Sequence, residues 1–489
     1  MRQPLIALLP VQAVLYFWNL GLLSPWFDEA GELLSMRSSL GSAVAVAASG
    51  GHPPLYFLIT YWWLRLPLGL DQAVQARALS VLFALAATLA ADRLWARFFP
   101  QGYRWCFLAL WTLSPCLLLY ARMCRSYSLQ LLVATIGAAY ILRFAKERTL
   151  RNGAILAAAL TVALYVHYVP AAALLAATNV TLLRDRRIQD AAALDAFAGI
   201  SFLPWLPKLW GFLGAWSTHA GYAITGSAAT ELPVKIGYWA VSFTMGEAMP
   251  DAILLAGGLV MIAVAAAVAL GARVRTDLVW IAVPMAIIGF IGVSRWVSYP
   301  FIPARMLFLF PVFLSLFVAG AASRPRLGVA AVAGMLALSM SGTWCYFHRI
   351  DFRNKQYAMP IAEIARLIQH ESTPNGSVVL VDSTNSDPAA LHYALGESRA
   401  ILTTRDDRAP DVLTQQLRDA RIRTVWFLRN THDVSAGGLN RQFEQRLRAG
   451  MRERVYSYEP LTPLEIWFLR AAGGGELPRY FHELLKFER

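Results

Sequence analysis

The sequence predicts a polytopic, all-α membrane protein of about eleven transmembrane helices, followed by a C-terminal α/β domain on the outer side of the membrane. Of the 489 residues, 57% are hydrophobic and 15% are charged, whereas average domains carry about 25% charged residues. Apolar runs near the length that crosses a ~30 Å hydrocarbon core recur through residues 1–346. Residues 347–489 instead alternate strand and helix patterns, which is typical of an α/β domain.

Basic residues indicate how the predicted helices are oriented. The net charge is +13, but its distribution argues against a nucleic-acid-binding protein, because the arginines form short clusters between apolar runs. Each cluster lies at an alternate turn, as the positive-inside rule expects of cytoplasmic loops. The clusters are Arg93, Arg97 and Arg104; Arg143, Lys146, Arg148 and Arg151; Arg184, Arg186 and Arg187; Arg273 and Arg275; and Arg324 and Arg326. The N-terminus is therefore predicted inside and residues 347–489 outside.

The spans follow one another along the chain. The first apolar run, LIALLPVQAVLYFWNLGLL, is interpreted as a retained span because no small-residue cleavage site follows it cleanly. Two long outer stretches are expected, at 25–72 and at 208–247. The spans are predicted at 4–24, 73–95, 105–120, 127–145, 152–168, 170–183, 191–207, 251–271, 277–294, 301–320 and 328–346.

One further segment, HPPLYFLITYWWLRLPLGL at 52–70, is apolar enough to span the membrane. Counting it as a span would reverse every later loop and place the arginine clusters outside. We therefore predict a helix that lies along the outer interface or dips into it, where aromatic side chains are favoured.

The C-terminal part is predicted to be a separate domain, 347–489, after a membrane module at 1–346. GSVVLVDS, RTVWFLRN and EIWFLR have the pattern of buried strands, whereas MPIAEIARLIQH and DVLTQQLRDA have the pattern of helices. No Gly-rich phosphate fingerprint follows VVLVDS, which argues against a dinucleotide site. The four cysteines show no metal or redox spacing: Cys106, Cys116, Cys124 and Cys345.

Polar residues from four separate segments gather on the predicted outer side. Carboxylates and arginines are costly at membrane depth unless they are paired or face a polar cavity. Their convergence on one face therefore points to a site that uses acid, base and cation together. The candidates are Asp28, Glu29 and His52 from the first outer loop; Arg122, Arg125 and Tyr127 after span three; His167 and Tyr168 between spans five and six; and Arg295 and Arg305 around span ten.

Each candidate also has a purely structural interpretation. Asp28 could cap the helix that EAGELLSM starts, and Arg122 and Arg125 could extend from a span end to the interface. His52 precedes two prolines, where a turn residue is common, and His167 could be an interfacial residue. Arg305 at an outer boundary runs against the positive-inside bias.

The order of these motifs resembles the C-type glycosyltransferase superfamily. Within it, the chain is similar to the family-39-like membrane transferases, which include protein O-mannosyltransferases and the enzymes that add aminoarabinose to lipid A. The resemblance covers residues 20–320 and its motifs keep the family's order. They are WFDEA, HPPLYFLITYWWLRL, SPCLLLYARMCRSYSLQLL, LYVHYV and PARMLFLFPVF. The start of the tail, FRNKQYAMPIAEIARLIQ…GSVVLVD, also resembles the outer α/β domain of bacterial members.

The resemblance implies a glycosyltransferase of a bacterial inner membrane. Its donor would be a polyprenyl-phosphate sugar presented at the outer leaflet, and its acceptor a hydroxyl of an envelope lipid, glycan or protein. It implies an inverting transfer in which Asp28 is the base, with adjacent Glu29 positioning it or exchanging roles with it. The leaving phosphate needs cations, and arginine suits that task through its fork of donors. Arg305, Arg295, Arg122 and Arg125 are the candidates for this role.

One departure from the family bears on metals. Many relatives carry a second acidic residue in the turn after span three, and some of them use it to bind a metal. Here that turn reads YARMCRSYS and has no Asp or Glu. We therefore expect a metal-independent reaction and predict no cofactor.

Three other functions are compatible with parts of the sequence. A transporter or flippase would usually show paired halves and broken helices near the midplane, whereas this chain concentrates its polar residues at one face. A protein that holds a lipid-linked intermediate without turnover is a second possibility, and substitution of Asp28 separates it from an enzyme. A phosphatase acting on the same lipid lacks an obvious nucleophile motif.

Overall fold

The structure is a computed structural model of the chain. It describes residues 4–218, 228–294, 301–381, 388–396, 399–403, 422–429, 447–458 and 483–489, together with residues 415, 444, 445, 462 and 467. The chain divides into two compact units. The membrane unit comprises 1–20 and 39–353, and the C-terminal unit comprises 21–38 and 354–489. The predicted first outer loop, 25–72, is thus shared between the units, because its part 25–38 packs with the C-terminal residues.

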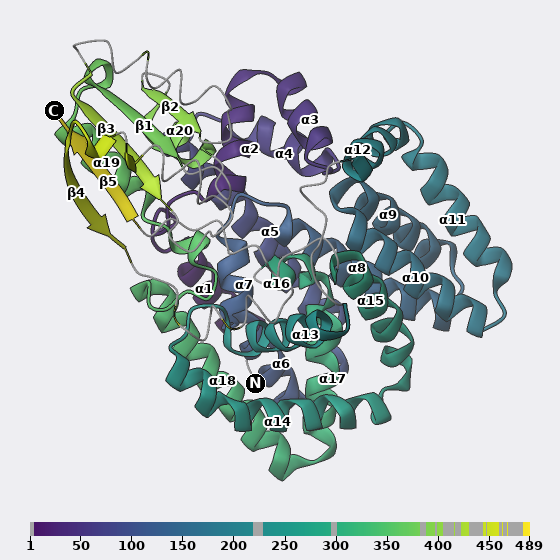
Figure 1. The fold of residues 1–489 in the computed structure, drawn as a ribbon. Coiled ribbons are helices and arrows are strands. Elements are labelled where there is room, and N and C mark those ends of the chain that lie inside the picture. The colour runs from purple at the N-terminus through teal and green to yellow at the C-terminus, as the bar shows by residue number, and fades with distance from the viewer. Residues whose placement is uncertain are drawn as a thin grey trace. The chain divides into compact units, whose positions relative to one another are not determined.

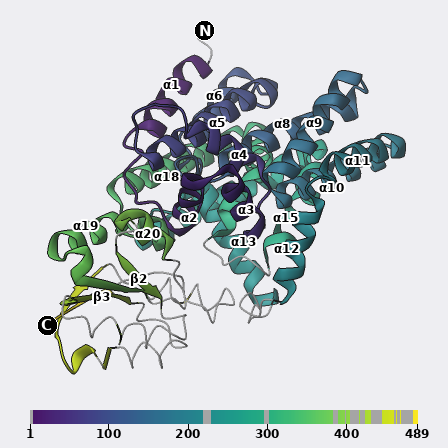
Figure 2. The same ribbon diagram turned by 90° about the horizontal axis from the view of Figure 1, so that it is seen from above.

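The membrane unit is built from helices (Figure 1), some of which lie within the predicted spans and others, such as α3 and α13, within the predicted outer stretches. Its helices are α1 (Pro4–Phe17), α3 (Leu40–Ser49), α4 (Leu55–Trp63), α5 (Gln72–Leu94), α6 (Gln101–Thr112), α7 (Pro115–Ala121), α8 (Tyr127–Lys146), α9 (Leu150–Val166), α10 (Tyr168–Arg184), α11 (Ile188–Phe202), α12 (Leu206–Thr218), α13 (Ala228–Met245), α14 (Asp251–Val274), α15 (Thr276–Ser294), α16 (Ile302–Arg305), α17 (Phe310–Ser323) and α18 (Pro325–His348). Helices α9, α10 and α11 pack against one another (Figure 2).

Four of the described helices are long and apolar enough to cross a membrane, or five if α6 and α7, which meet at a 45° bend, form one span. The chain is therefore a multi-pass membrane protein, and the count of eleven spans stays a prediction. Several predicted spans are shorter or broken helices. Span ten, for example, is divided into α16, a 3-10 turn at Leu307–Leu309 and α17. Helix α4 has nine residues, which at 1.5 Å per residue is too short to span. Its position at the interface stays a prediction.

Small residues bring α14 and α17 close together. The two helices are in contact, and a β-carbon at Gly271 would collide with the carbonyl oxygen of Leu316. A β-carbon at Gly320 would likewise collide with the carbonyl oxygen of Ala267. Glycine at these positions lets two backbones approach, which is how apolar helices gain packing contacts in a bilayer.

The C-terminal unit is an α/β domain, as predicted. Its helices are α2 (Phe27–Ser38), α19 (Ile361–Glu371) and α20 (Ala389–Leu395), and its strands are β1 (Ser377–Val381), β2 (Ala400–Thr403), β3 (Thr424–Arg429), β4 (Arg452–Ser457) and β5 (Glu483–Glu488). The sheet order is β2-β1-β3-β5-β4. Strands β2, β1 and β3 are parallel, whereas β5 runs antiparallel to β3 and to β4.

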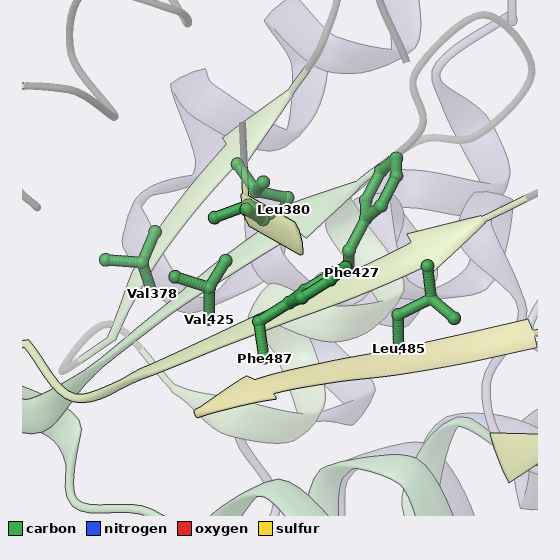
Figure 3. Packing of buried hydrophobic residues seen from close by; sticks show 7 residues of the cluster. Val378, Leu380, Val425, Phe427, Leu485 and Phe487 are labelled. Atoms are coloured by element: carbon green, nitrogen blue, oxygen red, sulfur yellow. The ribbon is translucent and has the colours of Figure 1, made fainter. Parts of the chain in front are cut away.

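The sheet buries different side chains on its two faces, because successive strand residues point to opposite sides. On one face, the strands contribute an apolar cluster shown in Figure 3: Val378, Leu380, Val425, Phe427, Leu485 and Phe487. The intervening residue Trp426 donates from Nε1 to the hydroxyl of Ser372, at the end of α19. The predicted strands GSVVLVDS and RTVWFLRN are confirmed as β1 and β3, and MPIAEIARLIQH as α19. EIWFLR and DVLTQQLRDA lie almost entirely outside the described residues.

Candidate functional site

Four segments of the membrane unit bring five of the predicted site residues together. His52 follows α3, Arg125 lies in the turn between α7 and α8, and Tyr127 begins α8. His167 lies at the break between α9 and α10, and Arg305 ends α16. We call these five residues, His52, Arg125, Tyr127, His167 and Arg305, the basic cluster. All five were selected from the sequence as candidates.

The cluster is arranged as two arginine–histidine pairs around one aromatic ring. Nη2 of Arg125 lies 3.3 Å from Nε2 of His52, and Nη1 of Arg305 lies 3.3 Å from Nε2 of His167. The two imidazole centroids are 6.1 Å apart. Both guanidinium carbons lie 5.9 Å from the centroid of the Tyr127 ring, within the range of a cation–π contact.

Helix ends hold these side chains in place. His167 is the N-cap of α10, and its Nδ1 accepts from the main-chain N of Val169 at 3.3 Å. A neutral imidazole has a single acceptor nitrogen. His167 can therefore accept from Val169 or from Arg305, but not from both at once. While it caps α10, the adjacent donor of Arg305 remains available to a ligand.

The histidines add no charge to the cluster near neutral pH. Burial lowers the pKa of His52 well below its ordinary value, and the positive charges of Arg125 and Arg305 lower it further. Burial and the same two arginines also lower the pKa of His167. The basic cluster thus contains two permanent cations, two neutral imidazoles and no carboxylate. This composition suits an anion with several oxygen acceptors, such as a phosphate.

Arg122 does not join the basic cluster. Its guanidinium donates to the main-chain carbonyl oxygens of Leu15, Tyr16, Trp18 and Asn19 and to the hydroxyl of Tyr346. Arg122 therefore holds the end of α1 to α7 and α18, and this accounts for its burial without a ligand. Tyr168 also points elsewhere, because its hydroxyl accepts from Nε1 of Trp205 at 2.9 Å. Arg295 lies outside the described residues.

Asp28 and Glu29 lie in the first turn of α2, within the C-terminal unit. Glu29 is buried and its carboxylate accepts from the main-chain N of Trp26 at 3.4 Å. This contact satisfies one of the open donors at the helix start. Asp28 is half-buried and lies inside α2, which begins at Phe27. The two neighbouring carboxylates thus have different surroundings, as expected for adjacent helical residues.

A buried carboxylate linked to the basic cluster was not among the predicted site residues. Glu247, between α13 and α14, is 1% exposed. It accepts from the hydroxyls of Tyr238 and Ser242, each at 3.1 Å, and from the hydroxyl of Tyr120. Burial raises the pKa of Glu247 to about 7, although these hydrogen bonds oppose the shift. The sequence signal for this residue is a lone glutamate in SFTMGEAMP, between two apolar helices. A carboxylate at membrane depth is costly unless other polar groups pair with it.

Glu247 is linked to the basic cluster through aromatic packing. Tyr120, which donates to Glu247, packs edge-to-face on Tyr127 with centroids 5.3 Å apart. Tyr127 in turn lies beneath both arginines of the cluster. Gly246, with φ +83, makes the turn before Glu247, and a β-carbon at this position would collide with the ring of Pro115. Glu247 therefore holds Tyr120, which packs against the Tyr127 ring that both arginines contact.

Solved structures resemble this fold over nearly the whole chain. ArnT from Cupriavidus metallidurans in the apo state matches with a TM-score of 0.55 and 14% identity, covering 99% of this chain and 97% of that one. The same protein bound to undecaprenyl phosphate matches with a TM-score of 0.52 at equal identity and coverage. The Archaeoglobus fulgidus oligosaccharyltransferase in complex with Zn and sulfate matches with a TM-score of 0.51 and 9% identity, covering 87% of this chain and 68% of that one.

No family model matches the chain, and no curated protein matches it. The structural likeness, at these identities, is a likeness of fold. The chain therefore has the fold of C-type glycosyltransferases, as its sequence motifs predicted.

Proposed function

We propose that this chain, which has the fold of C-type glycosyltransferases, transfers a sugar from a polyprenyl-phosphate donor to a hydroxyl of an envelope lipid, glycan or protein. The shared fold supports the reaction class. The donor class is supported by the related structure that carries undecaprenyl phosphate. In the predicted topology the transfer takes place at the outer face of a bacterial inner membrane.

The observation that carries this proposal is the composition of the basic cluster. Displacement of a lipid phosphate from a sugar builds negative charge on the departing phosphate oxygens. Arg125 and Arg305 supply fixed donors for that charge before the reaction starts, which is the condition for electrostatic catalysis. His52 and His167, held neutral, add hydrogen-bond capacity without further repulsion between cations.

In our proposal Asp28 is the general base. An acceptor hydroxyl must lose its proton as it attacks the sugar carbon, and a positioned carboxylate does this task. Attack on the face opposite the departing phosphate inverts the configuration at that carbon. Glu29 is the positioning residue, because its carboxylate is already engaged with the main chain at the start of α2. The reaction is proposed to need no metal.

The proposal is tested by comparing cells that produce the chain with otherwise identical cells that lack it. Mass spectrometry of envelope glycolipids and glycoproteins should reveal a sugar that is present with the wild-type chain and absent without it. Complementation with Asp28→Asn should leave that sugar missing at normal protein levels. Restoration of the sugar by Asp28→Asn would show that the base lies elsewhere, and identical envelopes with and without the chain would overturn the proposed transfer.

A further inference from the structure

A second cationic site lies in the membrane unit, at the opposite end of α8 from the basic cluster. There a cavity of about 520 Å³ is lined by the end of α5, the end of α8, the start of α9 and the turn between α14 and α15. Arg143 lies sixteen residues beyond Tyr127 on α8, which at 1.5 Å per residue separates the two sites by about 24 Å. The cavity is therefore not part of the proposed active site.

The cavity is strongly cationic. Four basic side chains line it, namely Arg97, Arg143, Lys146 and Arg275. The nearby acids are fewer: Glu147 lines the cavity, and Asp277 forms an ion pair with Arg275 at 2.9 Å. The cations at the end of α8 also offset the partial negative charge of a helix C-terminus. That effect corresponds to about half a charge, which is too little to account for four basic groups.

Two of the arginines are held by aromatic rings, which leave their charge intact. The guanidinium of Arg143 lies 5.1 Å from the ring centroid of Tyr140, and that of Arg97 lies 5.3 Å from the ring centroid of Phe98. Nη2 of Arg143 is buried and makes no hydrogen bond with any residue that the structure describes. A buried donor without a partner costs about 1–3 kcal/mol, and more for a charged group. An anion at this position would remove that cost.

The cavity wall is partly apolar. Leu94, Phe99 and Leu142 line it beside the arginines. Fixed cations next to apolar surface match a molecule that carries a phosphate on a carbon skeleton. Basic pockets between membrane helices on the cytoplasmic side bind phosphate head groups in this way, and the predicted topology places this end of α8 on that side.

We propose that this cavity binds a phosphate ester, with the phosphate oxygens on Arg97 and Arg143 and the carbon skeleton on the apolar wall. Two sources offer this chemistry: the head group of an anionic phospholipid, and a soluble phosphate ester. The site is independent of the proposed transferase activity, because its residues lie at the other end of α8 from the basic cluster.

Native mass spectrometry of the purified full chain in detergent tests the site with two probes, phosphatidylglycerol and glycerol 3-phosphate. We expect the double variant Arg97→Gln/Arg143→Gln to bind the relevant probe at least ~10-fold more weakly, since hydrogen bonds to charged groups contribute about 1.5–3 kcal/mol. Arg151→Gln, at an exposed position on α9, is the matched control and should bind like the wild type. The Arg305-dependent binding of undecaprenyl phosphate should be unchanged in the double variant, and its melting temperature should not fall.

The two probes distinguish the sources. Loss of phosphatidylglycerol binding alone identifies a lipid head group, whereas loss of glycerol 3-phosphate binding identifies a soluble ester. Absence of binding of either probe to the wild type would overturn the proposal, as would equal binding by the wild type and the double variant. Because undecaprenyl phosphate is measured in the same experiment, failure of this site is distinct from failure of the proposed transferase site.

Discussion

The basic cluster of the membrane unit and the sheet of the C-terminal unit both contain buried or half-buried cations, but the partners of these cations differ. In the sheet, Nζ of Lys486 lies 3.0 Å from a carboxylate oxygen of Glu371 and 3.0 Å from one of Glu488. In the basic cluster, Arg305 contacts a neutral imidazole and an aromatic ring. Among the described residues it has no carboxylate partner.

This difference distinguishes a cation that stabilises the fold from a cation that can bind an anionic ligand. A buried cation beside carboxylates is already compensated, and adding another anion there would be unfavourable. A buried cation without an acid keeps its field directed at the site, where it stabilises an arriving phosphate. Arg122 lies between these cases, because its donors are used by main-chain carbonyl oxygens.

The largest effect is expected from Asp28→Asn. Loss of a positioned base typically lowers turnover by ~10²–10⁴-fold, and asparagine preserves the size of the side chain. Donor affinity should stay the same, because the proposed phosphate contacts belong to the basic cluster. Turnover of a polyprenyl-phosphate sugar and affinity for undecaprenyl phosphate are measured on the same preparation. A drop in affinity without a drop in turnover would reverse the proposed division of roles.

Glu29→Gln is the matched comparison for Asp28→Asn. It should lower turnover less, because the amide oxygen of glutamine can still accept from the main-chain N of Trp26. A larger loss for Glu29→Gln than for Asp28→Asn would exchange the two roles. If Asp28 only stabilises the first turn of α2 through the helix dipole, asparagine should cost at most about 1 kcal/mol of stability, and turnover should hardly change.

Arg305→Ala should weaken binding of undecaprenyl phosphate by about 2–5 kcal/mol, the range for truncating one member of a buried charged contact. This corresponds to a loss of at least ~30-fold in affinity. Arg305→Lys should recover only part of it, because lysine keeps the charge but lacks the planar fork. Exposed Arg151→Ala is the control for a general loss of positive charge. Wild-type affinity in Arg305→Ala would exclude Arg305 from the donor site.

Glu247 predicts a pH dependence of stability. Burial raises its pKa from 4.5 to about 7 in the folded protein, so the folded state favours the protonated acid. Its contribution to stability is complete below pH 4.5 and is lost as the pH rises toward 7, for a total of about 3 kcal/mol. The melting temperature of the wild type should fall across this range relative to Glu247→Gln, which does not titrate. Parallel pH profiles for the two proteins would contradict this assignment.

The smallest effect is expected from Glu371→Gln in the C-terminal unit. The hydrogen bond from Lys486 lowers the pKa of Glu371, so the carboxylate stabilises the fold above its ordinary pKa of 4.5, and this contribution is lost as the pH falls. The pair is partly exposed, and such pairs contribute at most about 1 kcal/mol. The melting temperature should drop slightly at pH 7, and binding of undecaprenyl phosphate should be unchanged. A marked loss of undecaprenyl phosphate binding would contradict the distinction between a carboxylate-paired cation such as Lys486 and a ligand-binding cation such as Arg305.

The sequence by itself determined where the long apolar helices lie and which polar residues are candidates for the site. Apolar runs of the required length, ended by Pro, Gly or basic residues, identify spans such as α5, α8 and α14, because a bilayer admits few other backbone structures. Short continuous apolar runs identified β1 and β3, whose side chains are buried in the sheet. The sequence did not identify β4, whose residues are mostly exposed and lack that pattern.

Only the tertiary structure decided which polar residues meet. Arg122 and Arg125 are three positions apart in YARMCRSYS, yet one holds α1 in place and the other faces His52. The direction in which a side chain points from a turn depends on the residues that pack around the turn, and the local sequence does not specify those residues. The role of Glu247 could not be predicted from the local sequence for the same reason, since its hydrogen-bond donor Tyr120 is 127 residues away. The division of the first outer loop between the two units likewise depends on packing between α2 and α20, which are remote in the chain.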